Sequence, residues 1–288
     1  DFCLSRGLGD VYKRQFLNGI VPFVAYGIVV TIHMPMCLGM TNIIAPILSP
    51  KEFTEFMIKY KPNHTITVPT YVEHFVHDRK ADSINWKCLK NLGIGGDYFP
   101  EQSEIYVNEF LKNHGSSSIA EKGYGMTENS STAGVCLVGV NKTNSLGIPL
   151  PLNTYGIFER GTDKELKYGE EGEICITGPT EMLGYLDNEE EERKVIKIHS
   201  DGKKWIHSED VGIIDEDGFL FFKGRYKRLI PHGGFKLYPS YIEGVIMKHP
   251  DIDNCCVISI PDKVYGASPE AHVVIKKDSC LLYTSPSP

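Results

Sequence analysis

Short apolar segments of strand character alternate with stretches of helical periodicity between Met40 and Ala120. The strand-like segments are centred near residues 43, 66, 92 and 118, about 25 residues apart. This interval leaves room for one helix between consecutive strands, which is typical of repeated βαβ units and a parallel sheet. We therefore expect an α/β fold that begins with a parallel-sheet subdomain.

The strongest helix start in this series lies at Ser49, which we predict to be the N-cap residue. Pro50 then occupies the first helical position, and Glu52 completes a capping box. The apolar face follows the helical period at Phe53, Phe56, Met57 and Tyr60. Two further helices are expected within "TYVEHFVHD" and "PEQSEIYVNEFLKNHG", the second ending at Gly115.

The texture of the sequence changes after about Ser145, where short alternating strands and glycine turns predict an antiparallel β subdomain. "NEEEERKVIKIHSDG" predicts a charged helix, and "DVGIIDEDGFLFFKGRYKRL" predicts a hairpin that turns at "DEDG". From about Leu229 the pattern predicts the start of a small α+β domain, in which Ile242, Val245 and Ile246 point inward from a helix. We expect a large domain at 16–226, a partial small domain at 227–279 and a hinge near "GRYKR".

The most apolar stretch runs from Phe16 to Met40, but prolines, glycines, Asn18 and His33 interrupt it. We therefore expect no membrane span and instead a buried core helix near Tyr26 to Cys37. The net charge of −7 argues against a nucleic-acid partner. The eight cysteines include no C-x-x-C pair and no zinc-ligand spacing with histidine, so we expect reduced, mostly buried thiols in a cytoplasmic protein.

The two ends of the chain are related to each other at the level of DNA. One possible coding strand for residues 5–15, "SRGLGDVYKRQ", has a reverse complement that translates, one base along, to "CLLYTSPSP", which is residues 280–288. The DNA resembles a transposase-end adapter used in sequencing libraries. We therefore expect residues 1–15 and 280–288 to be adapter-derived, the intervening sequence to be an internal fragment, and both tails to lack ordered structure.

Ligands of parallel sheets bind beyond the carboxyl ends of the strands, where "GGD" at 95–97 and "YGMTE" at 124–128 are both expected. The glycines let backbone approach a ligand, and the ring of Tyr124 can lie against a flat base. Thr127 offers a hydroxyl to a phosphate, and Glu128 offers a hard oxygen ligand to Mg²⁺. A base, a phosphate and a magnesium ion suit a nucleotide such as ATP. A strand-end turn capped by Thr127 is the alternative.

The order of the motifs resembles the adenylate-forming (AMP-binding) superfamily, which includes acyl- and aryl-CoA synthetases, luciferases and peptide-synthetase adenylation domains. The resemblance covers nearly all of 16–279. The motifs that carry it are, in order, "PFVAYG", "GIGGDYFP", "GYGMTE", "LGIPLP", "GEEGEICITGPTEMLGYL", "WIHSEDVG" and "GFLFFKGRYKRLIPHGGFKLYPSYIE".

Several site residues follow from this resemblance rather than from the chemistry of the chain. It implies that Tyr124, with Gly125 in the signature loop, stacks on adenine, and that Gly96 and Asp97 line the adenine side. Thr127 is then expected to contact the α-phosphate and Glu128 the magnesium ion.

The resemblance also implies roles for four residues in the later motifs. Asp210 is expected to hold the ribose hydroxyls, and Arg225 to contact ribose or phosphate. Lys227 matches the hinge position, and Gly234 matches the glycine past which a thiol arm enters.

The activity implied by the resemblance is an acid–thiol ligase reaction with ATP, Mg²⁺ and coenzyme A, acting on a small carboxylic acid in a context such as fatty acid metabolism. The carboxylate forms an acyl-adenylate, and the thiol then displaces AMP. A carrier-loading or peptide-synthetase-like adenylation enzyme and a degenerate nucleotide-binding protein remain alternatives. The family's phosphate loop and late C-terminal lysine motif do not occur in the sequence, so we expect the isolated chain to be inactive.

Overall fold

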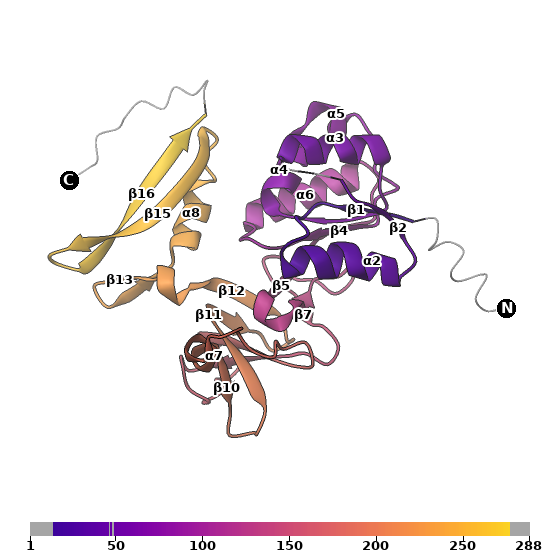
Figure 1. Ribbon diagram of the computed structural model, residues 1–288. Coiled ribbons are helices and arrows are strands. Elements are labelled where there is room, and N and C mark those ends of the chain that lie inside the picture. The colour runs from indigo at the N-terminus through magenta and orange to yellow at the C-terminus, as the bar shows by residue number, and fades with distance from the viewer. Residues whose placement is uncertain (1–13, 46, 48, 277–288) are drawn as a thin grey trace, which may run out of the picture.

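The computed structural model describes residues 14–45, 47 and 49–276, which form three sheets in chain order (Figure 1). The first sheet has the strand order β2-β1-β3-β4-β5-β6-β7. Its strands are β1 Gln15–Asn18, β2 Thr41–Ile43, β3 His64–Thr67, β4 Asn91–Ile94, β5 Ala120–Met126, β6 Ser131–Val135 and β7 Ile148–Pro149. The first five pair in parallel and the last two antiparallel, which confirms the α/β fold.

The four strands expected from the 25-residue interval are β2, β3, β4 and β5. Strand β1 was not expected, and it lies between β2 and β3. Of the residues expected to be adapter-derived, only Arg14 and Gln15 belong to the described part of the chain, and Gln15 pairs with Thr41. The prediction for the remaining tail residues lies outside the described residues.

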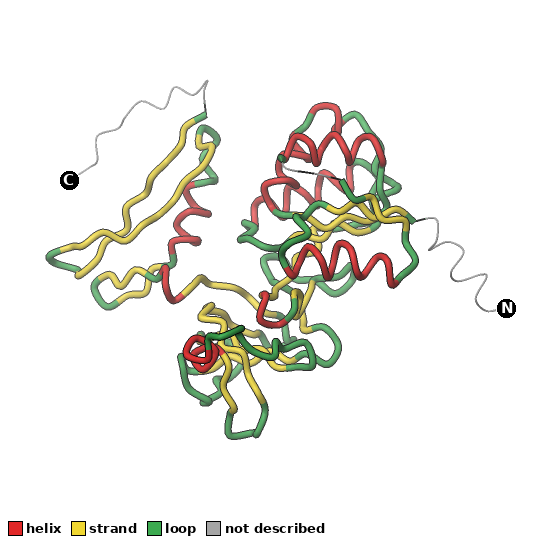
Figure 2. The backbone as a smooth tube through the Cα atoms, in the orientation of Figure 1, coloured by secondary structure: helices red, strands yellow, loops and turns green. Residues whose placement is uncertain are grey.

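Helices cover both faces of this sheet (Figures 1 and 2). One face carries α3 Pro50–Tyr60, α4 Pro69–His77, α5 Arg79–Asp82 and α6 Glu101–Asn113. The predicted cap of α3 is confirmed, because Ser49 Oγ accepts a 3.2 Å hydrogen bond from the Glu52 amide. The core beneath these helices includes the fully buried side chains of Phe53, Phe75, Trp86 and Leu111.

The other face carries a π-helix, η1 Tyr26–His33, which continues into α2 Met34–Cys37. The prediction of a buried core helix is wrong here, because only Gly27, Thr31 and Pro35 are buried. These three residues lie about one turn apart, and the apolar side chains of Ile28 and Val29 are exposed. Met36 is 63% exposed. Within the described ranges, no helix is long and apolar enough to cross a membrane.

The second sheet is antiparallel, as expected, with the order β10-β11-β9-β8 and β12 paired to β11. Its strands are β8 Thr154–Phe158, β9 Gly172–Thr177, β10 Ile196–Ile198, β11 Lys204–Ile214 and β12 Leu220–Arg225. The predicted hairpin is confirmed as β11 and β12. The charged helix is shorter than expected: α7 Glu189–Val195 ends where the chain pairs with β11 as strand β10.

The third sheet has the order β14-β13-β16-β15 and a small core around Ile230, Val257 and Ala267. Its elements are β13 Ile230–His232, β14 Phe235–Leu237, α8 Pro239–Ile246, β15 Ile252–Asp262 and β16 Gly266–Ile275. Ile242 and Ile246 of α8 pack against this core, but Val245 is 51% exposed. Consecutive helical residues point in different directions, so Val245 and Ile246 cannot share one face.

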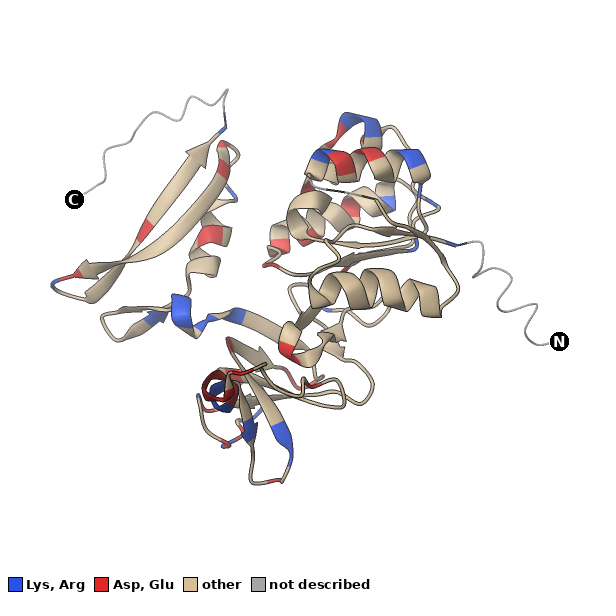
Figure 3. Cartoon of the chain, in the orientation of Figure 1, with Lys and Arg blue, Asp and Glu red and all other residues tan. Residues whose placement is uncertain are grey.

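A short 3₁₀ turn, η3 Tyr226–Arg228, connects the second sheet to the third. Lys and Arg positions gather along this link (Figure 3). The six cysteines in the described part of the chain are free, as expected, but only Cys136 and Cys175 are buried. The prediction of mostly buried thiols is therefore wrong.

Candidate functional site

A cavity of about 430 Å³ lies where the first and second sheets meet the start of the third. Its lining combines the segment after β4, strand β5, the paired strands β11 and β12, and the start of α8. Six of the site residues expected from the sequence line it, namely Gly96, Asp97, Tyr124, Gly125, Asp210 and Arg225. These six positions, distant in the sequence, therefore lie around one cavity.

Tyr124 and Asp210 meet in the wall of this cavity. The Tyr124 hydroxyl donates a 2.8 Å hydrogen bond to Asp210 Oδ2, and both residues are buried. Asp210 also faces Arg225 across the β11–β12 pair, with 3.1 Å between Oδ1 and Nε. Burial raises the pKa of Asp210 above its usual value, while the hydrogen bond from Tyr124 and the charge of Arg225 oppose that rise.

Gly96 and Gly125 are required for different physical reasons. Gly96 has a φ of +87° in the segment after β4, a conformation that favours glycine. Gly125 lies at a bulge in the β5–β6 pair, where an added Cβ would come within 1.8 Å of the Ser131 carbonyl oxygen. The close approach of strand β6 is therefore what requires a glycine at position 125. A bound ligand is not needed to explain it.

Thr127 and Glu128 do not line the cavity but follow β5 in the 3₁₀ turn η2 Thr127–Asn129. Glu128 Oε1 accepts a 2.6 Å hydrogen bond from the Tyr185 hydroxyl. Among the described residues no lysine or arginine forms an ion pair with Glu128. A carboxylate without a cationic partner is the type of group through which Mg²⁺ binds proteins.

Lys227 and Gly234 also lie outside the cavity lining. Lys227 Nζ is 2.8 Å from Glu209 Oε2 on an exposed surface. Gly234 has a φ of +87° in the turn between β13 and β14, and an added Cβ would meet nothing within 4 Å. The structure brings neither residue to Tyr124 or Asp210.

Comparison with known proteins places this geometry in a family. Residues 7–186 match the family described as AMP-binding enzyme, and residues 241–285 match the AMP-binding enzyme C-terminal domain. The chain belongs to the AMP-binding enzyme family. This agrees with the resemblance to the adenylate-forming superfamily.

Curated relatives of this AMP-binding protein include probable 4-coumarate–CoA ligase 1 of Dictyostelium discoideum, 32% identical over 93% of this chain and 48% of the relative. A long-chain-fatty-acid–CoA ligase of Bacillus subtilis is 30% identical over 90% of this chain and 45% of the relative. The chain thus spans about half the length of the curated relatives it matches.

Solved structures show the same fold at lower identity. ATP-bound MatB from Rhodopseudomonas palustris superposes with a TM-score of 0.82 at 21% identity, over 97% of this chain and 54% of that one. The o-succinylbenzoate CoA synthetase MenE of Bacillus subtilis, in complex with its acyl-adenylate intermediate, has a TM-score of 0.78 at 24% identity, over 92% of this chain and 52% of that one.

Sequence reasoning assigned no role to one charged pair at the cavity of this AMP-binding protein. Lys122 Nζ lies 2.5 Å from Glu104 Oε2, and both side chains are buried. The Asn144 amide donates a 2.8 Å hydrogen bond to the same oxygen. Lys122 and Asn144 line the cavity. Lys122 lies two residues before Tyr124 on β5, so both side chains point to the same face of the strand, and the sequence could have indicated Lys122 as a cavity residue. No local sequence feature indicates Glu104.

Proposed function

We propose that this chain is the nucleotide-binding part of an ATP-dependent acid–thiol ligase, which activates a carboxylic acid as its adenylate and transfers it to coenzyme A. The observation that carries the proposal is the contact between Tyr124 and Asp210 in the wall of one cavity. The CoA ligases among the curated relatives support the choice of coenzyme A as acceptor.

In this proposal the adenosine part of ATP occupies the 430 Å³ cavity. Asp210 accepts hydrogen bonds from the two ribose hydroxyls, since an ionised carboxylate has about four acceptor positions and Tyr124 and Arg225 use two. The ring of Tyr124 lies against adenine, and Gly96 and Asp97 line the adenine side.

The phosphates extend from the cavity toward η2, where Thr127 donates to the α-phosphate. Glu128 is the residue that would hold Mg²⁺, because its carboxylate is fixed by Tyr185 and has no cationic partner in the described part of the chain. A magnesium ion held by Glu128 would supply positive charge to the phosphates.

In the first step a carboxylate oxygen of the acid forms a bond to the α-phosphorus, and the bond to the bridging oxygen of pyrophosphate breaks. In the second step the thiolate sulfur attacks the acyl carbon, and AMP leaves with the electron pair of the broken C–O bond. Lys227 and Gly234 serve the second step, after rotation about the link at η3.

The proposal is tested by titrating ATP into the 288-residue chain in a calorimeter. Asp210→Asn should weaken binding about tenfold or more, because hydrogen bonds to a charged group are worth about 1.5–3 kcal/mol. Asp253→Asn, an exposed position on β15, is the matched control and should bind ATP like the parent chain. Absence of ATP binding, or equal binding by the two variants, would contradict the proposal.

The catalytic part is tested by ATP–pyrophosphate exchange with a panel of carboxylic acids. We expect exchange from the protein encoded by the complete gene and background exchange from this chain, whose sequence contains neither the phosphate loop nor the late lysine motif. Robust turnover by the chain alone would refute the second expectation.

A further inference from the structure

Strand β11 reaches the cavity through an irregular segment. Its pairing with β9 shifts register between His207 and Val211, so the residues between them form a bulge. Within this bulge Glu209 has a φ of +56°, which is unusual for a residue with a side chain. Asp210 is the last residue of the bulge and turns its carboxylate to Tyr124. A strained segment persists only where its surroundings hold it.

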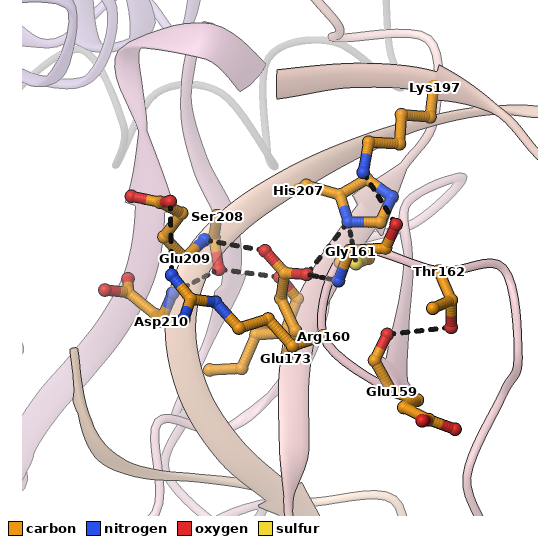
Figure 4. A network of polar contacts seen from close by, with 12 residues as sticks. Glu159, Arg160, Gly161, Thr162, Glu173, Lys197, His207, Ser208, Glu209 and Asp210 are labelled. Carbon is orange, nitrogen blue, oxygen red and sulfur yellow. Dashed lines mark hydrogen bonds and ion pairs between the residues drawn. The ribbon is translucent and has the colours of Figure 1, made fainter. Parts of the chain in front are cut away.

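The buried carboxylate of Glu173 on β9 lies beside this segment and is hydrogen-bonded to it (Figure 4). Its Oε1 accepts a 3.1 Å hydrogen bond from the Glu209 amide. Its Oε2 accepts bonds from the Gly161 amide at 2.9 Å and from His207 Nδ1 at 3.0 Å. Glu173 is only 2% exposed, so water does not replace these donors.

The environment keeps Glu173 ionised. Burial alone would raise its pKa, but the hydrogen bonds from His207 and Gly161 hold the pKa below its usual value. An ionised carboxylate only accepts hydrogen bonds, which matches the three donors around it. Ser208 provides a second anchor, because its hydroxyl donates to the Ile174 carbonyl at 2.6 Å and accepts from the Asp210 amide at 3.0 Å.

The same place offers oxygen, sulfur and nitrogen donors within 4.8 Å of one another, on Glu173, Cys175 and His207. Pairing of β9 with β11 creates this cluster, so no local spacing in the sequence could indicate it. Its atoms are already used in hydrogen bonds: the carboxylate accepts three, and Cys175 Sγ lies 3.5 Å from His207 Nδ1. Burial also raises the pKa of the Cys175 thiol, which opposes metal binding.

We propose that Glu173 is a positioning residue: by accepting hydrogen bonds from Glu209, His207 and Gly161, it holds the β11 bulge so that Asp210 stays turned into the nucleotide cavity. The role in nucleotide binding rests on the proposed function above. The role in holding the bulge depends on the geometry alone.

The test is Glu173→Gln, which keeps the shape of the side chain but removes its charge and one acceptor. ATP affinity, measured by calorimetry, should fall about fivefold to tenfold, the scale of one ordinary hydrogen bond, because Glu173 acts on the nucleotide only through Asp210. Adding Glu173→Gln to Asp210→Asn should cause little further loss, because the two residues act through the same contact. Ser208→Ala should behave in the same way and serves if Glu173→Gln does not fold.

If Glu173 only contributes to general stability, the losses of ATP affinity caused by Glu173→Gln and Asp210→Asn should instead multiply in the double variant. That result would overturn the proposal. Cys175→Ser is the matched control within the cluster and should bind ATP like the parent chain. The purified chain could instead contain stoichiometric zinc. If Cys175→Ser removes that zinc and also weakens ATP binding, the cluster is a metal centre and the proposal is overturned.

A second measurement separates failure of this inference from failure of the proposed function. Amide hydrogen exchange at Glu209 and Asp210 should become at least about tenfold faster in Glu173→Gln, while exchange in β15 and β16 stays unchanged. If the parent chain does not bind ATP, the proposed function fails and this readout still decides whether Glu173 holds the bulge. Unchanged exchange at both amides would refute the positioning role.

Discussion

The Tyr124 hydroxyl and Asp210 Oδ2 lie 2.8 Å apart although 86 residues separate them in the chain. The contact joins β5 of the first sheet to β11 of the second, and Tyr124 also packs in the core of the second sheet. This contact therefore both joins the two sheets and forms part of the cavity wall between them.

Tyr124→Phe should lower the free energy of unfolding by about 1–3 kcal/mol, because buried Asp210 loses a hydrogen-bond donor. Tyr155→Phe is the matched control. The Tyr155 hydroxyl is buried and has no hydrogen-bond partner among the described residues, so its removal should be neutral or stabilising. Urea unfolding of both variants measures the difference, and equal destabilisation would contradict the expectation.

The ion pair of Lys122 and Glu104 should be costly to break from one side. Lys122→Met leaves the Glu104 carboxylate buried without its cation, and we expect a loss of about 3–5 kcal/mol in unfolding free energy. Adding Glu104→Leu should recover part of that loss. Lys194→Ala removes exposed pairs with Glu190 and Glu191 and should change stability by less than about 0.5 kcal/mol. Similar losses for Lys122→Met and Lys194→Ala in urea unfolding would count against this account.

Glu121 should make stability fall as pH rises. Burial raises its pKa from 4.5 to about 7, even though Asn91 donates hydrogen bonds to both carboxylate oxygens. The folded state therefore favours the protonated acid. Its contribution is complete below pH 4.5 and is lost as pH rises through about 7.

Glu121→Gln imitates the protonated acid and should flatten this dependence. Relative to the parent chain, it should raise the unfolding free energy at pH 8 by up to about 3 kcal/mol and change little at pH 4. Thermal unfolding of the two proteins across this range measures the effect. A constant difference at all pH values would show that Glu121 does not titrate in this window.

Magnesium should strengthen ATP binding through Glu128. In the parent chain we expect Mg²⁺ to increase ATP affinity. At saturating Mg²⁺, Glu128→Gln should lower the ATP affinity about tenfold relative to the parent chain. Without Mg²⁺ the two proteins should bind ATP alike. Glu190→Gln, an exposed carboxylate on α7, is the control and should keep the full magnesium effect. A full magnesium effect in Glu128→Gln would exclude this residue as the ligand.

Much of the secondary structure could be predicted because its causes are local. Ser49 caps α3 through the Glu52 amide three residues away, and the "DEDG" turn joins two strands that are neighbours in the chain. By contrast, the exposure of η1 was not predicted, because the apolar side chains of Phe16–Met40 do not show which of them meet the sheet.

For the site, the sequence alone determined a compact motif, Tyr124 to Glu128, whose chemistry suits a nucleotide, and the ordered motifs indicated the family. Only the tertiary structure decided that the Tyr124 hydroxyl donates to Asp210, that Lys122 pairs with Glu104 and that Glu173 accepts a hydrogen bond from the β11 bulge. These contacts depend on strand pairing and burial between distant segments. A linear pattern records the kind of each residue and its neighbours, whereas the pairing of strands determines which side chains share a buried space.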